Sequence, residues 1–137
     1  LEKYAVLCGG GHNHRLNLSE MVLIKDNHLK AVKSLEFGVK SLRKAKPKMK
    51  IEIEVQSLQQ VEQFLKLKPD IIMLDNMGFS EMKKSINYIR QHSKCEIEIS
   101  GNVNLETVKK IASLKSDRIS VGQITHSANA LDISLEF

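Results

Sequence analysis

The residues best suited to chemistry lie in two neighbouring segments near the start of the 137-residue chain. They are residues 9–15, with the sequence GGGHNHR, and residues 22–28, with the sequence VLIKDNH. Three successive glycines let the backbone approach a ligand closely or adopt a positive φ. Arg15 and Lys25 can each bind a carboxylate, and the guanidinium of Arg15 can do so through two parallel hydrogen bonds. The two segments therefore predict a pocket for a small anion.

The histidines of these segments allow a second interpretation. His12 and His14 could form a metal-binding pair, with His28 as a third ligand. Arg15 follows this pair directly and would repel a cation. We therefore favour anion binding, and we expect His92, near the end of a predicted helix, to lie on the surface.

Polar or glycine residues stand at the end of every expected strand. They are Lys25, Glu54, Asp75, Ser100-Gly101 and Gly122. In a βα barrel the carboxyl ends of the strands face the active site, and the late loops bind phosphate through backbone N–H groups. Carboxylates at two of these positions would bind Mg²⁺ or sugar hydroxyls. Asn102 and His126 extend the two late loops, where His126 could donate to a phosphate.

These residues must be positioned by alternating strands and helices. Short apolar or alternating runs predict strands at residues 22–24, 51–55, 71–74, 95–99 and 118–121. Apolar residues three and four apart predict helices at residues 2–8 and 31–46, and others opening at Ser57, around Met82 and at a cap on Asn104. Alternating apolar residues at positions 131 to 137 favour a strand at the end of the chain.

This order predicts right-handed parallel βαβ units, in either an open doubly wound sheet or a barrel. The strands at 51–55 and 95–99 each carry two glutamates on one face and apolar residues on the other. A parallel strand in an open sheet is covered on both faces and should be apolar throughout. We therefore predict an α/β fold with a TIM-like parallel barrel, incompletely closed because five strands are too few. Glu52 is expected to be a buried, hydrogen-bonded acid, and Glu98 to lie nearer the mouth than Glu96.

The composition argues against nucleic-acid and membrane partners. The net charge is +5, but aromatic residues make up only 4% of the chain, so basic residues are not interleaved with the stacking rings that nucleic-acid binding favours. No run approaches the roughly 18 apolar residues that a membrane span needs. The two cysteines are too few for a disulfide framework and fit a reducing, cytoplasmic setting. Cys8 has no base arranged beside it, so we do not expect a nucleophile there.

Six separated motifs, in order along the whole chain, resemble those of the quinolinate phosphoribosyltransferases. They are KYAV at 3–6, GGGHNHR at 9–15, LIKDNH at 23–28, MLDN at 73–76, ISGN at 99–102 and THSANALD at 125–132. The resemblance implies that quinolinate and phosphoribosyl pyrophosphate react, with Mg²⁺, to give nicotinate mononucleotide, pyrophosphate and CO₂. This reaction is a step of NAD biosynthesis.

The resemblance also implies roles for individual residues. His14, Arg15 and Lys25 would bind the two carboxylates of quinolinate. Glu54 and Asp75 would bind the ribose and Mg²⁺ region of phosphoribosyl pyrophosphate. A phosphate would be surrounded by Ser100, Gly101, Asn102, Gly122 and His126. The family has an N-terminal α/β sandwich domain, a C-terminal incomplete barrel, and dimers in which one subunit covers the barrel mouth of the other.

Two departures from the family pattern matter. The chain begins just after a Thr-Arg-Lys-Thr segment of the family, so we expect residues 1–137 to be the barrel domain without the N-terminal domain and first barrel strand, and inactive alone. Asn102 stands where many members carry glycine, but asparagine tolerates left-handed backbone. Three alternatives stay open: a related phosphoribosyltransferase-like protein of molybdenum transport, an inactive barrel acting as an interaction module, and an aldolase or decarboxylase barrel with Lys25 as a Schiff base.

Overall fold

Five parallel strands form one sheet in the computed structural model, which describes residues 1–15, 17–25, 27–28 and 34–136. The strands are β1 (Met21–Ile24), β2 (Lys50–Val55), β3 (Ile71–Asp75), β4 (Glu96–Ser100) and β5 (Arg118–Ile119). They are hydrogen-bonded in the order in which they occur in the sequence, and every neighbouring pair is parallel. The predicted alternation of strands and helices is therefore confirmed.

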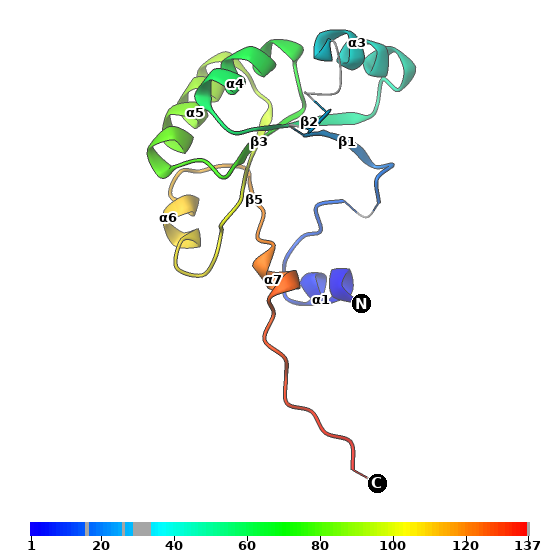
Figure 1. The fold of residues 1–137 in the computed structure, drawn as a ribbon, viewed down its shortest axis with the longest axis vertical. Coiled ribbons are helices and arrows are strands. Elements are labelled where there is room, and N and C mark those ends of the chain that lie inside the picture. The colour runs from blue at the N-terminus through cyan, green and yellow to red at the C-terminus, as the bar shows by residue number, and fades with distance from the viewer. Residues whose placement is uncertain (16, 26, 29–33, 137) are drawn as a thin grey trace.

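Helices precede, connect and follow the strands of this curved sheet. They are α1 (Glu2–Cys8), α3 (Leu35–Ala45), α4 (Leu58–Phe64) with the 3₁₀ turn η1 (Leu65–Leu67), α5 (Phe79–His92), α6 (Val108–Ala112) and α7 (Gln123–His126). Figure 1 shows α3 to α6 around the outer side of the sheet, whereas α1 and α7 lie together on the opposite side. The C-terminal segment after α7 extends away from both α1 and α7.

The strand order decides between the two predicted layouts. A doubly wound sheet reverses its strand order at a switch point, where the helices change faces. Here the order never reverses, so right-handed crossovers place the connecting helices on one side, as in a barrel. Within the described residues β1 pairs only with β2, and β5 only with β4, so the barrel is incomplete.

The two faces of the strands have different chemistry, as predicted. Ile53, Ile72 and Ile97 face outward, are completely buried, and pack in one core with α4 and α5. The inward face carries Glu52 and Glu98, which are also buried. This polar inward face distinguishes the sheet from one covered by helices on both sides.

Two aspartates, which sequence analysis did not identify, fix the amino ends of the strands. Asp70 Oδ2 accepts a hydrogen bond from the Ile51 N–H at 2.7 Å and from Arg43 of α3 at 2.7 Å. Asp117 Oδ2 does the same with the Ile97 N–H and with Arg90 of α5, again at 2.7 Å. Each aspartate directly precedes a strand, β3 or β5, and links the neighbouring strand to a connecting helix.

Several element boundaries differ from those predicted. The helix predicted for 31–46 begins at Leu35, because the Ser34 side chain accepts the Phe37 N–H; residues 31–33 lie outside the described residues. Asn104 Oδ1 accepts the N–H groups of Glu106 and Thr107, but it caps a turn, and the helix begins at Val108.

The prediction of a final strand was wrong for the described part of the tail. Residues 128–136 form no strand, and Leu131, Ile133 and Leu135 are exposed. The alternating pattern lacks a neighbouring strand there, and a strand cannot form without one. Phe137 lies outside the described residues.

Exposed apolar side chains gather at the side of the sheet opposite the outer helices. Leu1, Tyr4 and Leu7 of the α1 segment are exposed, as are Ile124 of α7 and the leucines of the tail. These segments therefore have an apolar surface that no described residue covers. In the part of the chain described here, no helix combines the length and hydropathy needed to cross a bilayer.

Candidate functional site

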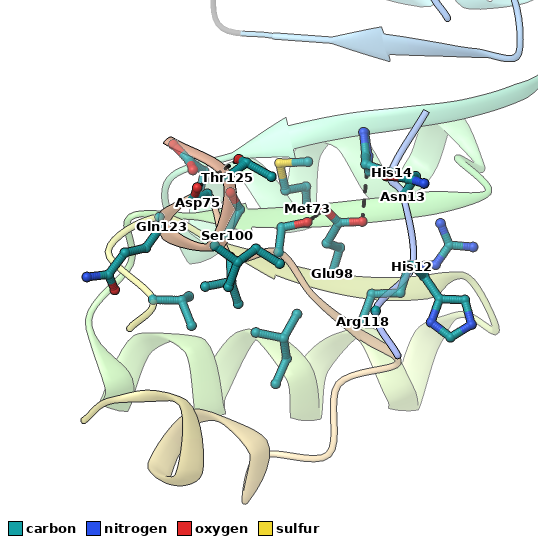
Figure 2. A pocket seen from close by; sticks show the side chains of 18 of the residues that line it. His12, Asn13, His14, Met73, Asp75, Glu98, Ser100, Arg118, Gln123 and Thr125 are labelled. Carbon is teal, nitrogen blue, oxygen red and sulfur yellow. Dashed lines mark hydrogen bonds and ion pairs between the residues drawn. The ribbon is translucent and has the colours of Figure 1, made fainter. Parts of the chain in front are cut away.

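An open cavity of about 1590 Å³ lies at the carboxyl ends of the strands. Figure 2 shows side chains from the glycine-rich segment, the strand ends and α7 facing it. Every site residue predicted from the sequence lines this cavity: His14, Arg15, Lys25, Glu54, Asp75, Ser100, Gly101, Asn102, Gly122 and His126. The structure therefore brings together residues that are more than 100 positions apart in the sequence.

Lys25 and Glu54 form an ion pair at the ends of β1 and β2. Lys25 directly follows β1, and its Nζ lies 4.0 Å from Glu54 Oε2 on β2. About half of the Lys25 side chain is exposed, so its ammonium can still reach a ligand in the cavity. The backbone N–H of Lys25 donates to His28 Nδ1 at 3.0 Å, which occupies that ring nitrogen. His28 is therefore a local structural partner of Lys25.

His14 lies above two buried acids. Its Nε2 is 2.9 Å from Glu52 Oε2 and 3.7 Å from Glu98 Oε2. The hydrogen bond to Glu52 raises the pKa of His14, and this effect exceeds the lowering by partial burial and by the neighbouring Arg15. His14 therefore holds a positive charge more readily than an ordinary histidine.

Glu98 has different hydrogen-bond partners from Glu52. Its Oε1 accepts a hydrogen bond from the Ser120 hydroxyl, on the residue that follows β5. Burial raises the pKa of Glu98, and the hydrogen bond from Ser120 only partly opposes this. Glu52 and Glu98 are both buried, as predicted for Glu52. Glu96, at the start of β4, forms ion pairs with Lys50 and Arg118, so Glu98 is nearer the cavity mouth than Glu96, as predicted.

The loop after β4 contains two successive residues with positive φ. Gly101 has φ +87° and Asn102 has φ +52°, so the asparagine adopts the left-handed backbone that we expected it to tolerate. Asn102 Nδ2 donates to Asn76 Oδ1 at 2.9 Å, and the Asn76 N–H donates to the Ser100 carbonyl at 3.1 Å. A Cβ at Gly101 would lie only 2.7 Å from Asn76 N. Only glycine fits this close approach of two strand-end loops.

A second loop, which follows the neighbouring strand β5, lines the same cavity. Gly122 is the N-cap residue of α7, and its carbonyl accepts the N–H groups of Thr125 and His126 at 3.0 Å. The His126 ring lies against Gly122, since a Cβ there would be 3.1 Å from ring atoms. His126 Nδ1 shares a hydrogen bond of 2.7 Å with the Ser127 hydroxyl.

Glu54 and Asp75 are suited to a hard cation. Both are carboxylates on the cavity wall, and Mg²⁺ prefers one or two such oxygens together with substrate phosphates. The alternative metal site, made of three histidines, is not assembled by the described residues. The group of possible ligands that does converge is His14, Glu52 and Glu98, in which His14 Nε2 is hydrogen-bonded to Glu52 and lies 3.7 Å from Glu98 Oε2.

Some cavity residues were missed by the sequence analysis. Met73, Arg118 and Ser120 line the cavity because they share the inward face with Glu54 and Glu98, as the strand register Glu54–Met73–Glu98–Arg118 shows. Counting alternate residues along each predicted strand would have identified them. Asn76 is a different case, because its contact with the Gly101 loop depends on backbone geometry that no spacing indicates.

Comparison with known proteins gives a consistent family. The family model "Quinolinate phosphoribosyl transferase, C-terminal domain" matches residues 1–136. The nicotinate-nucleotide pyrophosphorylase (carboxylating) of Mycobacterium leprae is 40% identical over 138 residues, covering 99% of this chain and 48% of the relative. The probable enzyme of the same name from Methanocaldococcus jannaschii is 39% identical and is covered to 50%.

Solved structures agree with the sequence relatives. The crystal structure of NadC from Streptococcus pyogenes is 42% identical and superposes with a TM-score of 0.85, covering 99% of this chain and 47% of that one. The chain thus spans about half the length of the relatives that it matches. It belongs to the quinolinate phosphoribosyltransferase family, whose C-terminal domain it matches almost from end to end.

Proposed function

We propose that this chain forms the barrel part of an enzyme that transfers phosphoribose to quinolinate and releases pyrophosphate and CO₂. One observation carries the proposal: three cationic groups, two carboxylates and two glycine loops converge on a single cavity in a chain of this family. Each kind of group matches one part of the two substrates.

The cationic side of the cavity suits a pyridine dicarboxylate. Arg15 donates to the Met21 carbonyl at 3.2 Å, which fixes its guanidinium beside β1 and leaves further N–H groups for a carboxylate. Lys25 and His14 supply two more positive groups on the same wall. Quinolinate carries two adjacent carboxylates, so it would engage more of these cations than a monocarboxylate could.

The opposite side suits phosphoribosyl pyrophosphate. Glu54 and Asp75 would hold the ribose hydroxyls and Mg²⁺, and the metal would neutralise charge on the leaving pyrophosphate. The loops at Ser100, Gly101 and Asn102 and at Gly122 and His126 would hold the phosphate. In barrels, phosphate is commonly bound by the loops after the last strands.

The chain's own residues would act by position and charge. The pyridine nitrogen would attack the anomeric carbon as pyrophosphate leaves, through a transition state with positive charge on the ribose. Glu54 and Asp75 lie on the cavity wall where such charge would be stabilised. The carboxylate next to the ring nitrogen would then leave as CO₂. The electrons of the broken C–C bond would stay on that ring carbon, stabilised by the positive nitrogen, and the carbon would take up a proton from water. No covalent bond to the protein is needed.

We further propose that the barrel acts together with the other half found in its relatives. Residues 1–137 would be the C-terminal barrel domain, and the relatives are about twice as long. Exposed Leu1, Tyr4 and Leu7 on α1 and Ile124 on α7 offer an apolar surface for that half or for a second subunit. A homodimer in which one subunit covers the other's cavity would bury this surface.

An activity assay tests this function. Nicotinate mononucleotide formation is followed for this chain alone, and for this chain mixed with the N-terminal half of the Streptococcus pyogenes relative. We expect turnover only in the mixture, and its loss when Lys25→Gln replaces the wild-type chain. Full turnover by the chain alone would refute the requirement for a second half, and an inactive mixture would refute the proposed function.

A further inference from the structure

Two buried acids lie at the cavity, Glu98 in its lining and Glu52 two strands away, and the proposed reaction gives neither a contact with substrate. Glu52 on β2 has no exposed surface, and Glu98 on β4 is 1% exposed. β3 lies between them and places Ile71 and Met73 on the same inward face. The interior of a barrel is usually filled by branched apolar side chains, and a buried carboxylate is costly unless it is paired. Packing alone therefore does not account for these acids.

Both carboxylates converge on one imidazole. The Nε2 atom of His14 lies 2.9 Å from Glu52 Oε2 and 3.7 Å from Glu98 Oε2. Figure 2 shows Glu98 pointing up from the sheet toward His14, joined to it by a dashed line. Within the described chain Glu52 Oε1 and Glu98 Oε2 have no hydrogen-bond donor. His14 is thus the group toward which their charge is directed.

Hydrogen-bond chemistry then indicates which nitrogen of the His14 ring carries the proton that faces Glu52. An ionised carboxylate only accepts, so His14 Nε2 must donate its proton to Glu52. A neutral ring with its proton on Nε2 would present a lone pair at Nδ1, and that lone pair would repel an anionic ligand. Only the imidazolium has N–H groups at both nitrogens. Nδ1 makes no hydrogen bond to any described residue, so it is available to a ligand in the cavity.

We propose that Glu52, supported by Glu98, is a positioning residue that holds His14 through Nε2 and so presents a charged Nδ1–H to a substrate carboxylate. The inference rests on the proposed function and adds to it a source of selectivity. Arg15 and Lys25 supply two positive groups, and a charged His14 supplies a third. A dicarboxylate uses the third cation, whereas a monocarboxylate does not need it.

The other charged groups near this cluster do not replace Glu52. Arg15 follows His14 in the sequence and opposes its positive charge. Arg118 on β5 acts on Glu98 only through its field, since its guanidinium pairs with Glu96. Lys25 pairs with Glu54. Glu52 is therefore the group whose removal should change His14 most.

The test removes the negative charge of Glu52 and keeps the shape of its side chain. Glu52→Gln retains an oxygen that can accept the Nε2–H but loses the negative charge. Glu36→Gln is the matched control, because Glu36 is exposed on α3 and pairs with Lys40. For each variant, the titration of the His14 ring is followed by NMR in the ligand-free chain. Affinities for quinolinate and nicotinate are measured by calorimetry, and folding by thermal unfolding.

We expect Glu52→Gln to lower the titration midpoint of His14 and to weaken quinolinate binding about ten- to hundredfold, the range for a hydrogen bond between charged groups. Nicotinate binding should change much less, and Glu36→Gln should change neither. If Glu52→Gln does not fold, Glu98→Gln serves instead, because it keeps the 2.9 Å bond and should lower the midpoint by a smaller amount.

Two results would overturn the inference. One is a His14 midpoint that stays unchanged in Glu52→Gln, and the other is an equal loss of quinolinate and nicotinate affinity. A wild-type chain that binds no quinolinate would instead refute the proposed function, and with it the substrate role of Nδ1. Even then, the ligand-free titration decides separately whether Glu52 controls the His14 ring.

Discussion

Replacing Gly101 by alanine tests the loop proposed to hold a phosphate. Gly101 has φ +87°, and an added Cβ would lie 2.4 Å from Asn76 Oδ1 and 2.7 Å from Asn76 N. The second contact is with backbone, so a side-chain rotation cannot relieve it. The loop after β4, the turn after β3, or both must move.

The cost has two parts. A left-handed backbone disfavours a residue with a Cβ by about 1–2 kcal/mol. Displacing Asn76 also breaks the 2.9 Å bond from Asn102 Nδ2, which contributes about 1 kcal/mol. The free energy of unfolding should therefore fall by about 2–3 kcal/mol. For a domain of this size the midpoint of thermal unfolding should fall by about 6–10 °C.

The control is a glycine with the opposite expectation. Gly38 lies inside α3, and a Cβ there would meet no atom within 4 Å. Gly38→Ala should raise stability by about 0.5–1 kcal/mol, because alanine favours a helix. Urea unfolding and calorimetric titration with phosphoribosyl pyrophosphate are carried out on both variants. A Gly101→Ala chain as stable as the wild type would refute the geometric argument, and one with lower stability but unchanged affinity would refute the proposed phosphate contact.

Three further substitutions test the rest of the structure by urea unfolding. Burial tends to raise the pKa of Asp117, but the hydrogen bonds from the Ile97 N–H and Arg90 outweigh it and hold the pKa below 3.8. The stability that the ionised Asp117 contributes is therefore complete above pH 3.8 and is lost as the pH falls through the lowered pKa. Asp117→Asn should therefore destabilise the chain at pH 7 and much less at pH 2; an equal loss at both would contradict this. Burial raises the pKa of Glu98 above 4.5, so its ionisation opposes folding as the pH rises. Glu98→Gln should therefore gain stability relative to the wild type as the pH rises above 4.5. A gain that does not grow with pH would contradict that sign. Ile89→Ala should cost about 2–5 kcal/mol, because Ile89 is completely buried between α5 and the sheet, and a cost below 1 kcal/mol would show that the core collapses around the gap.

The sequence predicted the strands, and that the candidate residues lie around one cavity, because both follow from local patterns. Glu52 and Glu54 alternate with isoleucines on one strand, and this pattern distinguished a barrel from a sheet covered on both faces. Lys25, Asp75 and Gly122 stand at strand ends, and parallel strands bring such ends together. Burial and the spacing of residues were sufficient for these conclusions.

The features that the sequence did not predict depend on contacts between distant segments. Asp70 bonds to Ile51 and Asp117 bonds to Ile97 across neighbouring strands, and no local pattern marks an aspartate for that position. The tail around Ile133 alternates like a strand but has no described neighbour with which to pair. Whether such a pattern becomes a strand is decided by the available sheet edge, which lies outside the segment itself.

The central claim is that the cationic wall of the cavity binds a pyridine dicarboxylate. Calorimetric titration of the chain with quinolinate, and separately with nicotinate, tests it most directly, because the two ligands differ by one carboxylate. Arg15, Lys25 and His14 predict that quinolinate binds at least about tenfold more tightly, since the second carboxylate adds a charge-assisted hydrogen bond. Equal affinity for the two ligands, or binding of neither, would contradict the claim.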